Sequence, residues 1–170
     1  MSLSTNGTLR SAPASDTATR PRTVVVGYDG SDEARAAFAV AIDRSQPSDT
    51  IVVVHASAPA SGWLGEPYYQ RAVTQAHEAA EGVLDELRPI AEQVDKPIEF
   101  EALEGPPAEV LIRAASVRDA DEIVVGSRGL GRLRGAIGSV SQELLREAGR
   151  PVLVISRDAA TVLGAPALAS

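Results

Sequence analysis

Residues 122–145 read EIVVGSRGLGRLRGAIGSVSQELL, and the order of elements in this stretch decides the fold. The first six residues, EIVVGS, form a short apolar run rich in β-branched side chains, as in strands that are buried on both faces. After a glycine-rich connection, Ser139 and Gln142 have capping-box spacing, which predicts a helix that Ser139 caps. Gly149 and Pro151 predict the end of this helix before a last apolar run. Strand, helix and strand in this order indicate parallel strands joined by a crossover.

The same alternation of apolar runs and helical periodicity extends over most of the chain. Helices are expected to begin after Ser31, as a cap, and at Pro106 and Pro107. A long helix is also expected between the second and third strands, and Pro89 should kink it near its end. We therefore predict an α/β fold with a single doubly wound, Rossmann-like parallel sheet of five strands and helices on both faces. The third strand alternates apolar and acidic residues and should have an exposed face or lie at an edge, and the last should lie at an edge. The predicted strands are residues 23–28, 51–56, 97–103, 122–127 and 152–156.

The two ends of the chain depart from this pattern. Residues 1–21 are rich in Ser, Thr, Ala and Pro and have no periodicity, which predicts a disordered arm. Residues 158–170 are similarly simple and are predicted to form a C-terminal tail. One folded domain is expected between them, over residues 22–157.

Composition and charge exclude several classes of function. A net charge of -7 argues against binding to nucleic acid or to an anionic membrane. The absence of cysteine excludes disulfides and thiol catalysis, and His55 and His77 are too far apart to predict a metal site. No segment resembles a signal peptide or a membrane span, so we expect a cytoplasmic protein.

The glycine-rich connection is the strongest candidate for a binding site. Ligands of such sheets bind beyond the carboxyl ends of the strands, where the strand order reverses. Residues 126–138 contain five glycines together with Arg128, Arg132 and Arg134, and residues 123–142 include no acid. Glycine, arginine and the start of a helix together favour a polyphosphate. The alternative is a long connection whose arginines only keep it solvated.

Other phosphate-binding folds fit the sequence less well. The only lysine, Lys96, is far from any glycine-rich turn, which excludes a P-loop. The turn after the first strand, residues 27–32, reads GYDGSD and lacks the glycine spacing of a dinucleotide-binding fold. A receiver domain would need several acids after the first strand and a lysine after the last strand, and both are missing.

The chain resembles the universal stress protein family over residues 22–157. The resemblance rests on VVVGYDGS at 24–31, IVVVHA at 51–56, and GSRGLGRLRGAIGSVSQELL at 126–145 followed by PVLVIS. Nucleotide-binding members of that family carry the motif G-x2-G-x9-G-[S/T]. This chain has Gly126, Gly129, Gly138 and Ser139, with eight residues instead of nine in the longer gap.

The resemblance implies a site for ATP, or for ADP or AMP, with Mg²⁺ as a candidate companion. Asp29 would hold the ribose or order the phosphates, but an Asp before a glycine also forms turns by itself. Ser31 would cap its helix and also face the phosphates, and backbone groups near Val54 would meet the adenine edge. The phosphates would contact Gly126, Arg128, Gly129, Gly138, Ser139, Val140 and Ser141.

We expect a non-catalytic regulatory protein of the stress response, with at most weak ATPase activity. Asp29 is the only acid in the relevant strand-end turn, and no residue has the character of a committed catalytic base. The alternatives are a slow ATP-hydrolysing or adenylyl-transferring enzyme, and a nucleotide-free stress protein that acts through dimerisation. The apolar edge of the last strand, together with the resemblance, predicts a homodimer through residues 152–156.

Overall fold

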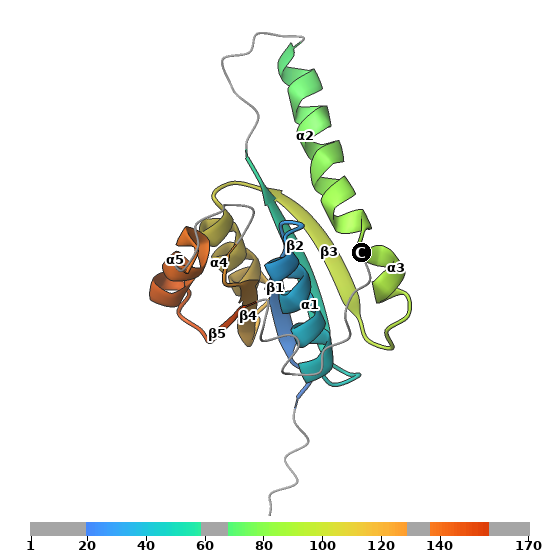
Figure 1. Ribbon diagram of the computed structural model, residues 1–170, viewed down its shortest axis with the longest axis vertical. Coiled ribbons are helices and arrows are strands. Elements are labelled where there is room, and N and C mark those ends of the chain that lie inside the picture. Colours follow the sequence, from blue (N-terminus) through green and yellow to red (C-terminus); the bar gives the residue numbers. More distant parts are fainter. Residues whose placement is uncertain (1–19, 59–67, 129–136, 157–170) are drawn as a thin grey trace, which may run out of the picture.

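The computed structural model describes residues 20–58, 68–128 and 137–156, which form an alternating series of strands and helices (Figure 1). The elements are β1 (Thr23–Gly27), α1 (Asp32–Arg44), β2 (Thr50–Ser57), α2 (Tyr68–Asp85), α3 (Arg88–Ala91), β3 (Ile98–Glu104), α4 (Pro107–Val117), β4 (Glu122–Gly126), α5 (Ser139–Glu147) and β5 (Val152–Ile155). Each predicted strand is present, with ends shifted by at most one residue. The predicted arm and tail lie almost entirely outside the described residues and stay predictions.

All five strands lie in one parallel sheet of order β3-β2-β1-β4-β5, which confirms the predicted fold. The chain builds outward from β1 to β2 and β3, then returns to place β4 on the other side of β1. Val26 of β1 therefore lies opposite Val124 of β4, although the two residues are far apart in the sequence. The strand order reverses at this pair, so ligands of such a sheet would bind beyond the carboxyl ends of β1 and β4. β3 and β5 lie at the edges, as expected.

Apolar side chains fill the space on both faces of the sheet. Alternate residues of β1 point to opposite faces, so Val24 and Val26 pack under α1 and α2 while Val25 packs under α4 and α5. Phe38 of α1 and Leu144 of α5 are fully buried on their respective sides. Helices therefore cover both faces, as the doubly wound fold requires.

The start of α5 corrects the sequence prediction. Gly138, and not Ser139, is the cap residue, and Ser139 is the first residue of the helix. The N–H of Gly138 donates to the carbonyl of Ser127 (2.7 Å), which holds Gly138 in an extended conformation outside the helix. Gln142 Nε2 donates to the carbonyl of Ile137 (2.8 Å) instead of completing a capping box.

Pro89 breaks the helix that it was expected to kink. α2 ends at Asp85, and Pro89 lies in the first turn of the separate helix α3. A proline has no N–H to donate, and its ring clashes with the carbonyl four residues earlier, which here belongs to Asp85. Among the helices within the described residues, none combines the length and apolarity that a membrane crossing requires.

Candidate functional site

The candidate site lies at the carboxyl ends of β1 and β4, where the sheet brings three segments together. The turn of residues 28–31 follows β1, residues 126–128 include the last residue of β4 and the two that follow it, and residues 138–141 include the cap and first turn of α5. Predicted site residues from all three segments therefore lie at one edge of the sheet. Gly129, Arg132 and Arg134 lie outside the described residues, and their predicted roles stay predictions.

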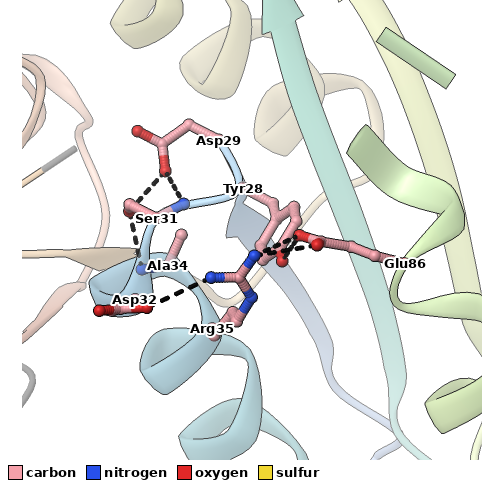
Figure 2. A network of polar contacts seen from close by, with 7 residues as sticks. All are labelled: Tyr28, Asp29, Ser31, Asp32, Ala34, Arg35 and Glu86. Atoms are coloured by element: carbon pink, nitrogen blue, oxygen red, sulfur yellow. Dashed lines mark hydrogen bonds and ion pairs between the residues drawn. The ribbon is translucent and has the colours of Figure 1, made fainter. Parts of the chain in front are cut away.

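Asp29 and Ser31 order the turn between β1 and α1. Asp29 Oδ1 accepts hydrogen bonds from the backbone N–H of Ser31 (3.1 Å) and from its hydroxyl (2.6 Å), as Figure 2 shows. Ser31 Oγ in turn accepts from the N–H of Ala34 (3.2 Å), which confirms the predicted cap. Gly30 has a φ of +79°, a conformation that glycine adopts without strain. Both predicted structural roles are therefore present, and a ligand-binding role of Asp29 or Ser31 would be additional.

A buried tyrosine anchors this turn from the side of α2. The Tyr28 hydroxyl donates to Glu86 Oε1, and Arg35 Nη2 donates to Glu86 Oε2 (2.9 Å) (Figure 2). Burial and the hydrogen bond to Glu86 raise the pKa of Tyr28 well above its ordinary value. Burial acts to raise the pKa of Glu86 as well, but the hydrogen bonds from Tyr28 and Arg35 outweigh it and the pKa lies below its ordinary value. Sequence reasoning missed this network, because Tyr28 and Glu86 are 58 residues apart and no local pattern connects them.

Gly126 has a structural reason to be glycine. A Cβ atom at this position would lie 2.8 Å from the backbone carbon and the Cβ of Glu33 and 3.0 Å from the nitrogen of Ala34. The carbonyl of Gly126 also accepts a hydrogen bond from Ser141 Oγ (2.8 Å), whose side chain is buried. Gly126 and Ser141 therefore hold the starts of α1 and α5 against the end of β4.

Two hydrogen bonds close the ends of the glycine-rich connection. The N–H of Ser127 donates to the carbonyl of Ile155 (2.6 Å), and the carbonyl of Ser127 accepts from the N–H of Gly138 (2.7 Å). The backbone N–H groups of Ser139, Val140 and Ser141 have no hydrogen-bond acceptor among the described residues. The first turn of α5 also contains no acid. The N–H groups at the start of a helix and the helix dipole together favour an anion at this position.

Arg128 is not an isolated cation, although the sequence around it is free of acids. Its Nη2 lies 3.6 Å from Oε1 of Glu33, in the first turn of α1. The fold brings this acid to the glycine-rich connection from a distant part of the chain. The locally cationic character that the sequence predicts is therefore reduced at Arg128.

Val54 lies where the resemblance places the adenine contact, but its carbonyl has a partner within the sheet. Val54 is opposite Gly27, and its carbonyl accepts from the N–H of Tyr28 (2.9 Å). The next residue, His55, has Nδ1 2.9 Å from the carbonyl of Tyr28, so its ring also braces the turn after β1. Within the described part of the chain, no group of three or more acids or histidines is suited to a metal ion.

Comparison with known proteins gives the same family for sequence and fold. The sequence profile described as the universal stress protein family matches residues 21–156. A universal stress protein of Thermus aquaticus is 38% identical over 136 residues, which are 79% of this chain and 98% of that protein. The structure of the universal stress protein UspA from Lactobacillus plantarum superposes with a TM-score of 0.69 at 22% identity, over 80% of this chain and 98% of that one.

A further solved structure carries a ligand. It is described as a universal stress protein in complex with cAMP and is 25% identical, with a TM-score of 0.62 over 81% of this chain and 98% of that one. The matched region covers the complete described sheet and the candidate site at its carboxyl edge. On the evidence of the sequence profile, the Thermus relative and the parallel five-stranded sheet, the chain belongs to the universal stress protein family.

Proposed function

We propose that the chain binds an adenine nucleotide, ATP, ADP or AMP, beyond β1 and β4 and acts as a non-catalytic regulatory protein of the stress response. The first turn of α5 carries the proposal, because the N–H groups of Ser139, Val140 and Ser141 have no acceptor among the described residues and this turn itself contains no acid. The relative with bound cAMP supports an adenine nucleotide as the ligand.

The geometry of the edge supports a role for those predicted residues that the structure describes. The phosphates would lie at the N-terminus of α5, over Gly138, with Arg128 beside them, and against the side-chain-free surface of Gly126. The turn of Asp29 and Ser31 would face the ribose, and the end of β2 near Val54 would face the adenine. Mg²⁺ would arrive bound to the phosphates, because the described residues form no acidic cluster suited to a metal ion.

A regulatory role fits this arrangement better than catalysis. Asp29 is the only acid in the turn after β1, and its Oδ1 already accepts two hydrogen bonds from Ser31. A general base must be free to take a proton from the attacking water. We therefore expect phosphate release from ATP, if measured in a single-turnover assay, to be slower than nucleotide dissociation.

The proposal includes cytoplasmic location and a homodimer through residues 152–156. β5 pairs with β4 on one side and lies at the edge of the sheet. Val152, Leu153 and Val154 are only partly buried within the chain. An apolar edge strand of this kind favours pairing with a second copy.

Calorimetric titration with AMP, ADP and ATP, each with and without Mg²⁺, tests nucleotide binding. Nucleotide released on denaturing the purified protein provides an independent measurement. Gly129→Glu places a carboxylate in the glycine-rich connection and should abolish binding. Gly82→Glu is the matched control, because a Cβ at Gly82 of α2 would meet nothing within 4 Å. Absence of binding by the unaltered chain, together with absence of released nucleotide, would favour the nucleotide-free alternative.

A further inference from the structure

The ion pair between Arg128 and Glu33 lies inside the proposed phosphate site. Glu33 is the second residue of α1, and its backbone and Cβ pack directly against Gly126. The side chain of Glu33 is 17% exposed and that of Arg128 is 36% exposed. Packing of α1 on the end of β4 therefore places the carboxylate of Glu33 beside Arg128. Arg128 is the one arginine of the glycine-rich connection that the structure describes.

The geometry of this pair is that of a weak, exchangeable contact. The nitrogen and oxygen are 3.6 Å apart, which is beyond the usual length of a charge-assisted hydrogen bond. Arg128 also remains in contact with solvent, and ion pairs that solvent reaches contribute little free energy. A phosphate carries more negative charge than a carboxylate and accepts two parallel hydrogen bonds from a guanidinium, so it can take the place of Glu33.

The other acids near the start of α1 have different positions. Asp32 pairs with Arg35 (3.3 Å), on the side of α1 that faces Glu86, and Asp29 holds Ser31 (Figure 2). Among the described residues, Glu33 is the acid that pairs with Arg128.

We propose that Glu33 competes with the nucleotide phosphate for Arg128 and so sets the nucleotide concentration at which the site fills. This inference rests on the proposed function of nucleotide binding at the same edge. In the free chain, Glu33 neutralises Arg128 and keeps it oriented toward α1. On binding, Arg128 exchanges the carboxylate for a phosphate oxygen, and the lost pairing with Glu33 weakens the measured affinity.

Calorimetric titration of four proteins tests this competition: the unaltered chain, Glu33→Gln, Arg128→Gln and the double variant, each with AMP and with adenosine. Glu33→Gln should tighten AMP binding about two- to fivefold, the range that corresponds to a weak ion pair within reach of solvent. Adenosine has no phosphate, so its affinity should not change. Arg128→Gln should weaken AMP binding, and adding Glu33→Gln to it should give no gain.

Two further variants separate competition at Arg128 from a general effect of charge. Asp43→Asn removes one negative charge from the exposed last turn of α1 and should leave the affinity for AMP unchanged. Glu33→Asp keeps the charge but shortens the side chain, and should give part of the gain.

Three results would overturn the inference. AMP binding that Glu33→Gln leaves unchanged or weakens contradicts competition. If Glu33→Gln raises the affinity for AMP equally when Arg128→Gln is also present, or if Asp43→Asn raises it by the same factor, the tighter binding is due to overall charge. Absence of AMP and adenosine binding in every variant, the unaltered chain included, contradicts the proposed function itself and this inference with it.

Discussion

Gly126 shows how a single missing side chain shapes the site. A Cβ atom there would lie 2.8 Å from backbone and side-chain atoms of Glu33, and backbone at the start of a packed helix cannot yield easily. Gly126→Ala should therefore lower the free energy of unfolding by about 1–3 kcal/mol, as overpacking does. Urea unfolding measured against the unaltered chain checks this expectation.

Gly82→Ala is the matched control for that experiment. Position 82 is within α2, and a Cβ there would meet nothing within 4 Å. Alanine is the better helix former, so this change should raise the free energy of unfolding by about 0.5–1 kcal/mol. Equal free energies of unfolding for Gly126→Ala and Gly82→Ala would contradict the close packing of α1 on Gly126.

Glu86 makes stability depend on pH in a defined direction. Its pKa in the folded chain lies below the ordinary value of 4.5, because the hydrogen bonds from Tyr28 and Arg35 outweigh burial. The folded state therefore binds this proton more weakly, so the contribution is complete above about pH 4.5 and is lost as pH falls through the folded pKa. The stability advantage of the unaltered chain over Glu86→Gln should shrink in that acid range. A difference that stays constant with pH would contradict the network.

Local sequence patterns predicted single residues where the partner was nearby. The turn formed by Asp29 and the cap formed by Ser31 involve residues at most three positions apart. Glu86 and Glu33 could not be predicted, because their contacts with Tyr28 and Arg128 depend on how distant segments fold together. The sequence shows that the glycine-rich connection is rich in arginine. It does not show that the fold brings Glu33 to Arg128.

Ser31 is the residue on which the start of α1 depends. Its hydroxyl accepts from the N–H of Ala34 and donates to Asp29, so Ser31→Ala removes both contacts. The expected loss is about 0.5–2 kcal/mol of unfolding free energy, as for other helix caps. Urea unfolding is again the measurement.

Ser116→Ala is a suitable control for Ser31→Ala. Ser116 is an exposed residue of α4 whose hydroxyl donates to the carbonyl of Ile112 in the same helix and accepts a long, exposed hydrogen bond from Arg150 Nη2 (3.3 Å). The intrahelical contact adds little stability to a helix, and Arg150 keeps its shorter hydrogen bonds to the carbonyls of Ala115 and Ala120, so the change should have a small effect. Equal losses from the two serine variants would show that Ser31 does not act as the cap.

Most elements could be predicted because each has a local cause. Apolar β-branched runs predicted every strand to within one residue at each end. The start of α5 could not be predicted in the same way, since Gly138 is kept out of the helix by a hydrogen bond to Ser127, across the glycine-rich connection. Pro89 was recognised as an interruption, but a complete break requires α3 to pack separately after Leu87, which is buried.

The edge of the sheet at β5 is the surface through which we expect the whole molecule to dimerise. Val152→Lys places a charge on the outer strand β5 and should convert the proposed dimer to monomers in light scattering coupled to size exclusion. Val117→Lys, at a position 78% exposed at the end of α4, is the control and should stay dimeric. A dimer that survives Val152→Lys, or an unaltered chain that is monomeric, would reject this interface.

The strand order is the property of the whole molecule that creates the site. Alternating strands and helices predicted a parallel sheet from the sequence, and the order β3-β2-β1-β4-β5 then places β1 beside β4. The order follows from how α1, α2 and α4 pack on the two faces, which depends on contacts between distant residues. A reversal of the strand order could therefore be expected from the sequence. Only the structure shows that β1 and β4 are the strands that form it.

Amide NMR spectra recorded during titration with AMP test nucleotide binding beyond β1 and β4, because they locate the ligand on the folded chain. Saturable shifts should gather at the carboxyl ends of β1 and β4 and at the start of α5: residues 29–31, 126–128 and 138–141. Amides at the opposite ends of the strands, such as those of Thr23 and Glu122, should stay in place. Saturable shifts confined to other surfaces, or no shifts with AMP, ADP or ATP, would contradict nucleotide binding at this edge.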